Sequence, residues 1–106
     1  MIRKGTYNIR CKDGLKEVDG YIYTTSVQGD PMSFGITQYD DGWYVITELS
    51  SGLRMPFETN INLLSAIIPL RILLHNKGDA IKISAKKAAI KYGKANDVRC
   101  TDDERS

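Results

Sequence analysis

Short segments of alternating apolar and polar residues dominate the first 57 residues of the chain. They are rich in Tyr, Ile, Val and Thr, which favour the pleated, half-buried surface of a β-sheet. Three Asp-Gly pairs, at positions 13–14, 19–20 and 41–42, separate several of these segments, and Asp-Gly is typical of hairpin turns. The pattern predicts an antiparallel, meander-like sheet over about residues 1–57, with strands at 6–11, 21–27, 33–39, 43–49 and 53–55.

The clearest predicted hairpin joins residues 33–39 to residues 43–49 through Asp41-Gly42. A two-residue loop there would place Asp40 opposite Trp43 and Tyr39 opposite Tyr44. One face of the hairpin would then carry the tyrosine pair and remain outside. The other face is predicted to be buried and to carry Phe34, Ile36, Trp43, Val45 and Leu49.

A helix is predicted over about residues 60–77, capped by Thr59 or Asn60 and ended near Gly78. Pro69 removes one helical hydrogen bond, so we expect a kink there or two short helices. Residues 61–74 are almost entirely apolar, which predicts that most of this helix is covered, by the Phe34 face of the sheet.

The last third alternates briefly at Asp79–Ile83, which favours a short edge strand, and Ser84 is placed to cap a second helix over 84–93. A single helix from Ala80 is the alternative, with Ile81, Ala85, Ala88 and Tyr92 on one face. The polar tail at 94–106 is expected to be flexible. These predictions describe one α+β domain spanning residues 1–106.

Size and composition exclude several classes of protein. A chain of 106 residues with 42% hydrophobic content is too apolar to be disordered and long enough to bury a core. The polar start gives no sign of a secretory signal, and the apolar segment, about 21 Å long as a helix, is too short to cross a bilayer. Cys11 and Cys100 show no CxxC or metal-type spacing, and two isolated thiols in a chain without a signal are expected to be reduced, with a disulfide between the two ends of the chain as the alternative. We therefore expect a cytoplasmic protein without membrane contact.

Catalytic and metal-binding patterns do not emerge from the sequence. His75 is the one histidine, and no nucleophile or acid is placed beside it by a recognisable motif. Asp40-Asp41-Gly42 fails as a calcium loop because Thr37 and Tyr39 fall where acids are required. We therefore expect no enzyme, no metal site and no cofactor.

Charge is distributed unevenly along the chain. Residues 12–60 hold eight acidic and three basic residues, whereas residues 71–99 hold eight basic and two acidic ones. The basic segment at 83–93 resembles the first helix and turn of small helix-turn-helix domains, but no amphipathic second helix follows it. Its lysines form either a phosphate-binding stripe or a solvated helix face.

Two functions are compatible with these observations. The first is a small non-catalytic protein that regulates or inhibits a protein partner, as small accessory proteins of phages and mobile elements do, through Tyr39, Tyr44, Asp40 and Asp41. The alternative is nucleic-acid binding through the basic segment, and the oligomeric state, including a homo-oligomer, stays open. The alternative would use Lys82, Lys86, Lys87, Lys91, Lys94 and Arg99.

Overall fold

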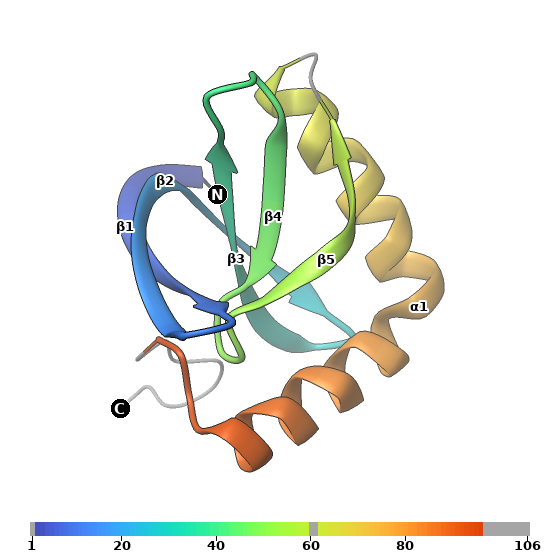
Figure 1. Cartoon of the computed structure of the whole chain (residues 1–106). Helices are drawn as coiled ribbons and strands as arrows, with labels where there is room; N and C mark the ends of the chain where they lie inside the picture. The colour runs from blue at the N-terminus through green and yellow to red at the C-terminus, as the bar shows by residue number, and fades with distance from the viewer. Residues whose placement is uncertain (1, 60–61, 97–106) are drawn as a thin grey trace.

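The computed structural model describes residues 2–59 and 62–96 of the chain. Five strands pair antiparallel in chain order to form one sheet, and the helix packs against it (Figure 1). The structure confirms the predicted α+β fold with an antiparallel meander in the N-terminal part. The elements are β1 (Ile2–Cys11), β2 (Gly14–Val27), β3 (Asp30–Gln38), β4 (Tyr44–Glu48), β5 (Leu53–Thr59) and α1 (Leu63–Tyr92).

The first two strands form a long, strongly curved hairpin (Figure 1). Asp19-Gly20 was expected to form a turn, but it lies inside β2, where Gly20 pairs with Gly5. A Cβ atom on Gly20 would lie only 2.4 Å from the carbonyl oxygen of Ile36. The glycine is therefore required by the close approach of a neighbouring strand, and the turn prediction is wrong.

The β3–β4 hairpin differs from the prediction by one residue of register. Phe34 pairs with Glu48 and Ile36 pairs with Ile46, and the loop runs from Tyr39 to Trp43. A two-residue loop needs positive φ at both central residues, but of Asp41 and Gly42 only Gly42 has it (φ 91°). The loop is therefore longer than predicted. Phe34 and Ile36 are buried on the side of α1 as predicted, but the one-residue shift places Val45 and Leu49 on the opposite face, where they are also buried.

The larger core lies between the sheet and α1. Tyr21 and Tyr23 lie on this side of β2. They pack with residues of β3, β4, β5 and α1, and the buried members of this core are Tyr23, Val27, Met32, Phe34, Ile36, Ile46, Met55, Ala66, Leu70, Leu74 and Ala85.

α1 is one element of 30 residues whose backbone leaves helical geometry at Lys77, so it consists of two helical parts, and the alternative of a single helix from Ala80 describes the second part. Asp79–Ile83 is helical, so the predicted strand and the Ser84 cap are wrong. The kink lies at Lys77 (φ −129°, ψ 20°) and not at Pro69. Gly78 is buried beside it, and a Cβ there would approach the Val27 side chain to 2.9 Å. The first helical part thus ends next to Gly78, as predicted, and the absence of a side chain there also allows α1 to lie close to the end of β2.

A smaller core lies on the opposite side of the sheet, inside the curl of β1 and β2. Tyr7, Ile22 and Leu49 are its buried members. The Tyr7 ring lies over Gly35, and the Tyr7 hydroxyl is hydrogen-bonded to Thr37. Together with the core under α1, this cluster means that both faces of the central strands are buried.

The segment after α1 is hydrogen-bonded to β1 and to the end of β4 and the turn that follows it. The Asn96 amide donates to the carbonyl oxygens of Asn8 (2.8 Å) and Leu49 (2.9 Å) and accepts from the Asn8 N–H (2.6 Å). The Ala95 N–H donates to the Ser50 carbonyl at 3.0 Å. Residues 94–96 were expected to belong to a flexible tail, but Ala95 and Asn96 bridge the edge of β1 and the β4–β5 turn, while residues 97–106 lie outside the described residues.

Candidate functional site

The most unusual surface of the protein is the side of α1 that points away from the sheet. Leu64, Ile68 and Ile72 follow one another at four-residue spacing and expose 62%, 50% and 57% of their surfaces. Residues four apart lie on the same side of a helix. We call these three residues the outward face. The expectation that the apolar segment is mostly covered is therefore wrong for this side.

Burial separates the two sides of α1 sharply in its first half. Ala66, Leu70 and Leu74 point to the sheet and are buried. Of the ten large apolar residues that are exposed in the described part of the chain, six belong to α1. Single exposed apolar residues are normal on protein surfaces, whereas a concentration on one element indicates an interaction site.

The start of α1 is fixed by a cap two residues before Leu64, the first residue of the outward face. The Asn62 side chain accepts hydrogen bonds from the Ser65 N–H at 2.8 Å and the Ser65 hydroxyl at 3.0 Å. The cap was predicted at Thr59 or Asn60; the observed one is Asn62. It satisfies one of the amides that a helix leaves unpaired at its start and so holds Leu64 and Ile68 in helical geometry.

The second half of α1 carries the lysines. Lys86, Lys87 and Lys91 are exposed, and Lys91 lies near the Tyr92 ring, 5.1 Å from its centroid. Lys82 is paired with Asp30 at 2.5 Å, so it belongs to the fold rather than to a free basic stripe. Lys94 is exposed, and Arg99 lies outside the described residues.

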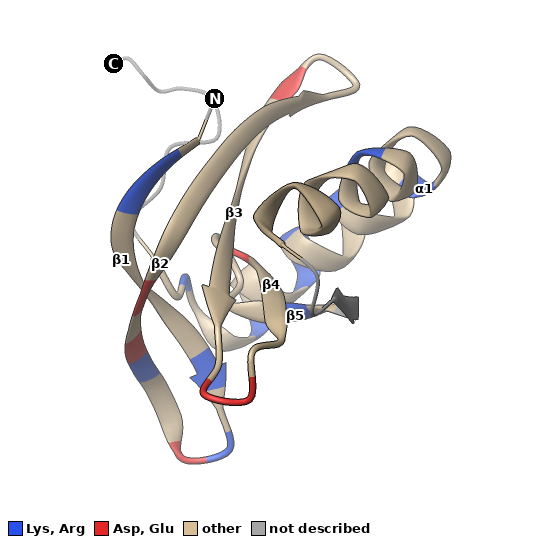
Figure 2. Cartoon of the chain, turned by 90° about the horizontal axis from the view of Figure 1, so that it is seen from above, with Lys and Arg blue, Asp and Glu red and all other residues tan. Residues whose placement is uncertain are grey.

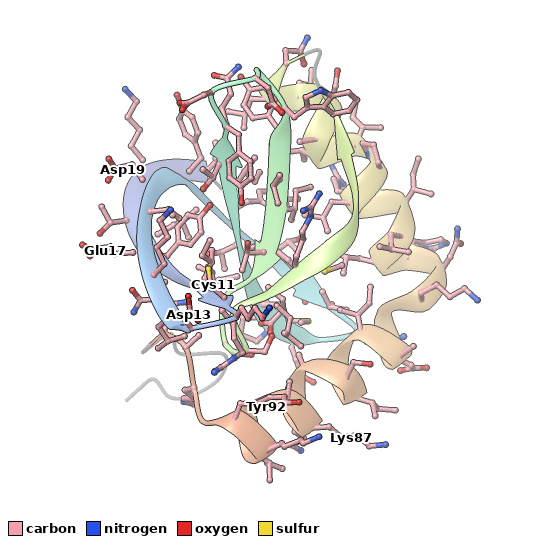
Figure 3. The ribbon with its side chains drawn as sticks, in the orientation of Figure 1. Cys11, Asp13, Glu17, Asp19, Lys87 and Tyr92 are labelled. Atoms are coloured by element: carbon pink, nitrogen blue, oxygen red, sulfur yellow. The ribbon has the colours of Figure 1, made fainter. Side chains whose placement is uncertain are left out.

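The acidic side chains of the β1–β2 hairpin do not neutralise this basic half. Figure 3 shows Asp13, Glu17 and Asp19 along the β1–β2 side of the molecule. Lys87 lies on the C-terminal half of α1 and points outward, away from these acidic side chains. In Figure 2 the basic residues recur along α1, and an acidic loop joins β3 and β4. Ile83 and Ile90, exposed by 55% and 79%, interrupt the lysines. The outer side of this half is therefore both basic and apolar.

Of the four residues predicted to bind a protein, three lie together in one exposed loop and Tyr44 lies elsewhere. Tyr39 is exposed in the β3–β4 loop with Asp40 and Asp41, and the Asp41 carboxylate accepts a hydrogen bond from the Trp43 N–H at 3.0 Å. Tyr44 lies on the helix side of β4, packed against the larger core. The predicted tyrosine pair on an outer face is therefore wrong, because it depended on the shifted register.

A buried carboxylate that the sequence analysis did not single out lies under the β4–β5 turn. Glu48 is 3% exposed and accepts hydrogen bonds from the N–H and hydroxyl groups of both Ser50 and Ser51. It lines a mainly apolar cleft of about 260 Å³ between β5 and the second half of α1. Because four donors surround the carboxylate, its geometry is that of a group holding a turn. The sequence signal that could have indicated this buried carboxylate is the Glu-x-Ser-Ser spacing of residues 48–51.

Within the described residues, no three His, Cys, Asp or Glu side chains gather as a metal site would require. The same residues include no helix long and apolar enough to cross a membrane. Cys11 is a free, exposed thiol, and Cys100 lies outside the described part of the chain.

Comparison with known proteins gives no match: no family model, no curated protein and no solved structure shows significant similarity to this chain.

Proposed function

We propose that this chain is a non-catalytic binding protein that docks a protein partner on the outward face of α1. The observation that carries the proposal is the row of Leu64, Ile68 and Ile72, each half-exposed or more on a helix that is otherwise well anchored. A row of side chains at four-residue spacing forms a ridge that fits the groove of a partner helix. Burying the exposed half of each side chain contributes roughly 1 kcal/mol, or about 3 kcal/mol for the row.

The charge of α1 indicates the chemistry of the partner. Along the helix, six basic residues are accompanied by one acidic residue, Asp79, and Arg71 lies beside the row. A partner with an apolar groove and an acidic rim would complement this surface, because opposite charges at the rim speed association and suppress wrong partners. Two copies of α1 would repel one another, so we expect the isolated protein to be a monomer.

Affinity capture from the source cells, with the full chain as bait, is the first step of the test. The captured protein is identified, purified and titrated against the chain by calorimetry. The variant Leu64→Ser/Ile68→Ser/Ile72→Ser is expected to bind about 100-fold more weakly, which corresponds to the loss of about 3 kcal/mol. Ile83→Ser/Ile90→Ser is the matched control and is expected to bind normally. Unchanged affinity of the triple variant contradicts the proposal.

Nucleic-acid binding is a second candidate because Lys86, Lys87, Lys91 and Lys94 are exposed and have no acidic partner among the described residues. Four phosphate contacts would give a slope of about −3 to −4 for log affinity against log salt. Ile83 and Ile90 lie among these lysines and interrupt a continuous phosphate-binding surface. Gel shifts at two salt concentrations, with Lys86→Glu/Lys87→Glu/Lys91→Glu as the variant, separate the two functions.

The free thiol of Cys11 is typical of a reducing compartment, so we propose that the interaction takes place in the cytoplasm.

A further inference from the structure

A polar cleft of about 280 Å³ lies between the end of β2, the β2–β3 turn and α1 just before its kink. Two buried apolar side chains, Val27 and Leu74, are among its lining residues. The rest of the lining is polar and comes from two elements that are far apart in the sequence: Thr25, Ser26, Gln28, Arg71 and His75.

The polar lining offers hydrogen-bond donors and no carboxylate. Arg71 supplies up to five N–H donors in a planar fork that suits carboxylate and phosphate oxygens. His75 follows one helical turn later, on the same side of α1. Among the described residues, neither side chain has a hydrogen bond or ion pair. Thr25 and Ser26 add hydroxyl groups from the facing strand.

The turn at the edge of the cleft is held in a conformation that its sequence does not favour. Gln28 has φ 54°, the one positive φ of a non-glycine residue in the described chain, and Gly29 follows with φ 87°. A two-residue turn with both φ values positive prefers Asn-Gly or Gly-Gly. A glutamine there is unfavourable for the backbone, but its longer side chain carries an amide into the cleft lining.

The fit between this turn and α1 is equally specific. A Cβ on Gly78 would lie 3.5 Å from the Gln28 amide nitrogen and 2.9 Å from Val27. The absence of a side chain at Gly78 therefore leaves the room that Val27 occupies next to the kink, with the Gln28 amide close by. The cleft is thus formed by a strained turn and a helical turn bearing two nitrogen donors.

We propose that this cleft is an oxyanion site, which binds a carboxylate or phosphate group between Arg71, His75 and the end of β2. The inference goes beyond the docking proposal, because a free anion can bind here without a partner. Arg71 and His75 also lie one turn apart beside Ile68 and Ile72, so an acidic side chain of a docked partner could reach the same donors. In both cases the Arg71 guanidinium would donate hydrogen bonds to an oxyanion, either a planar carboxylate or a tetrahedral phosphate.

The test is a titration of the full chain, free of partner, followed by amide and imidazole NMR signals. Inorganic phosphate is the probe in one arm, and N-acetyl-glutamate amide is the probe in the other. We expect saturable shifts of the signals of Thr25, Ser26, Gln28 and His75. Tighter phosphate binding identifies a small phosphate ligand, and tighter carboxylate binding identifies a partner side chain. Shifts that do not saturate in either arm, or that are as large at Lys86 and Lys87, overturn the proposal.

Three variants make the result specific. Arg71→Gln is expected to weaken binding at least tenfold, whereas Lys87→Gln, which removes a charge elsewhere on α1, is expected to leave it unchanged. Gln28→Asn is expected to keep or raise the melting temperature while weakening binding, because asparagine suits the turn but has a shorter reach. Equal losses in Arg71→Gln and Lys87→Gln overturn the site. Normal phosphate binding by the Leu64→Ser/Ile68→Ser/Ile72→Ser variant separates this site from the docking proposal.

Discussion

The interior of the protein and the outward face of α1 are made of the same kind of aliphatic side chain, yet they have opposite environments. Leu70 is fully buried, whereas Ile68 and Ile72, two residues away on either side, expose half or more of their surfaces. Hydrophobicity alone therefore does not tell which side of this helix meets the sheet.

Position on the helix, and not side-chain size, separates the two sides. The buried positions of α1 hold Leu70 and Leu74 as well as Ala66, Gly78, Ala85 and Ala88, so leucine occurs on both sides. The small residues allow the helix axis to lie close to the strands where they occur. The comparison teaches that helical spacing and tertiary packing decide which side of α1 contacts the sheet, and that the row on the other side remains available for binding.

The largest expected contrast comes from a matched pair of truncations. Leu70→Ala should lower the free energy of unfolding by about 3–4 kcal/mol, because it leaves a cavity in the larger core. Ile72→Ala, on the outward face, should change it by less than about 0.5 kcal/mol. Urea denaturation of both variants measures the difference. Similar losses in the two variants would show that Ile72 also belongs to the core.

The second prediction concerns the interior on the other side of the sheet. A Cβ on Gly35 would lie 2.3–2.6 Å from three atoms of the Tyr7 ring, so Gly35→Ala should cost about 3 kcal/mol, the upper end for overpacking. In the double variant Gly35→Ala/Tyr7→Leu the smaller side chain should restore part of that stability. A fully stable Gly35→Ala protein would contradict the described packing.

The third prediction is a pH dependence that belongs to the same interior. Burial raises the pKa of Tyr7 from 10.0 to about 12, the Thr37 hydrogen bond opposes the rise, and the charge of Tyr39 adds to it. Between pH 10 and 12 the unfolded chain loses the Tyr7 proton while the folded chain keeps it. The free energy of unfolding should therefore fall by about 2–3 kcal/mol through Tyr7 as the pH rises through this window. Below pH 10 both states keep the proton, so Tyr7 gives no pH dependence there. In the Tyr7→Phe variant the free energy of unfolding should lose this part of its pH dependence. Parallel curves of stability against pH for the two proteins would show that Tyr7 is not the group responsible.

The smallest effect on stability is expected on the outward face. Leu64→Ser/Ile68→Ser/Ile72→Ser should shift the free energy of unfolding by no more than about 1 kcal/mol, since each half-exposed side chain makes few contacts. Thermal and urea unfolding measure it on the same preparation used for binding. A loss of several kcal/mol would mean that this row stabilises the fold itself, and the contrast between the two regions would disappear.

Local patterns in the sequence were sufficient for the fold class. Alternation and turn residues predicted a meander of strands, and the apolar segment predicted a helix packed on it. They failed where tertiary contacts decide. Gly20 looks like a turn signal, but it makes room for the neighbouring strand at Ile36. Gly78 does lie at the break in α1, but its close approach to Val27 could not be predicted from local sequence.

The candidate site could be predicted even less. The one-residue error in the β3–β4 register rested on reading Asp41-Gly42 as a two-residue loop, and it created a tyrosine pair that does not exist. The outward face could not be found from hydrophobicity, because residues 61–74 are apolar on every side. The cleft beside Arg71 joins residues more than forty positions apart, so no local pattern points to it.

The central claim is that a protein partner contacts α1 through Leu64, Ile68 and Ile72. Methyl NMR of the chain, labelled at the δ1 carbons of isoleucine, tests it most directly when the purified partner is added. The account predicts large shifts or broadening at Ile68 and Ile72, with Ile83 and Ile90 on the lysine-bearing half unchanged. Unperturbed Ile68 and Ile72 signals in a saturated complex would contradict it.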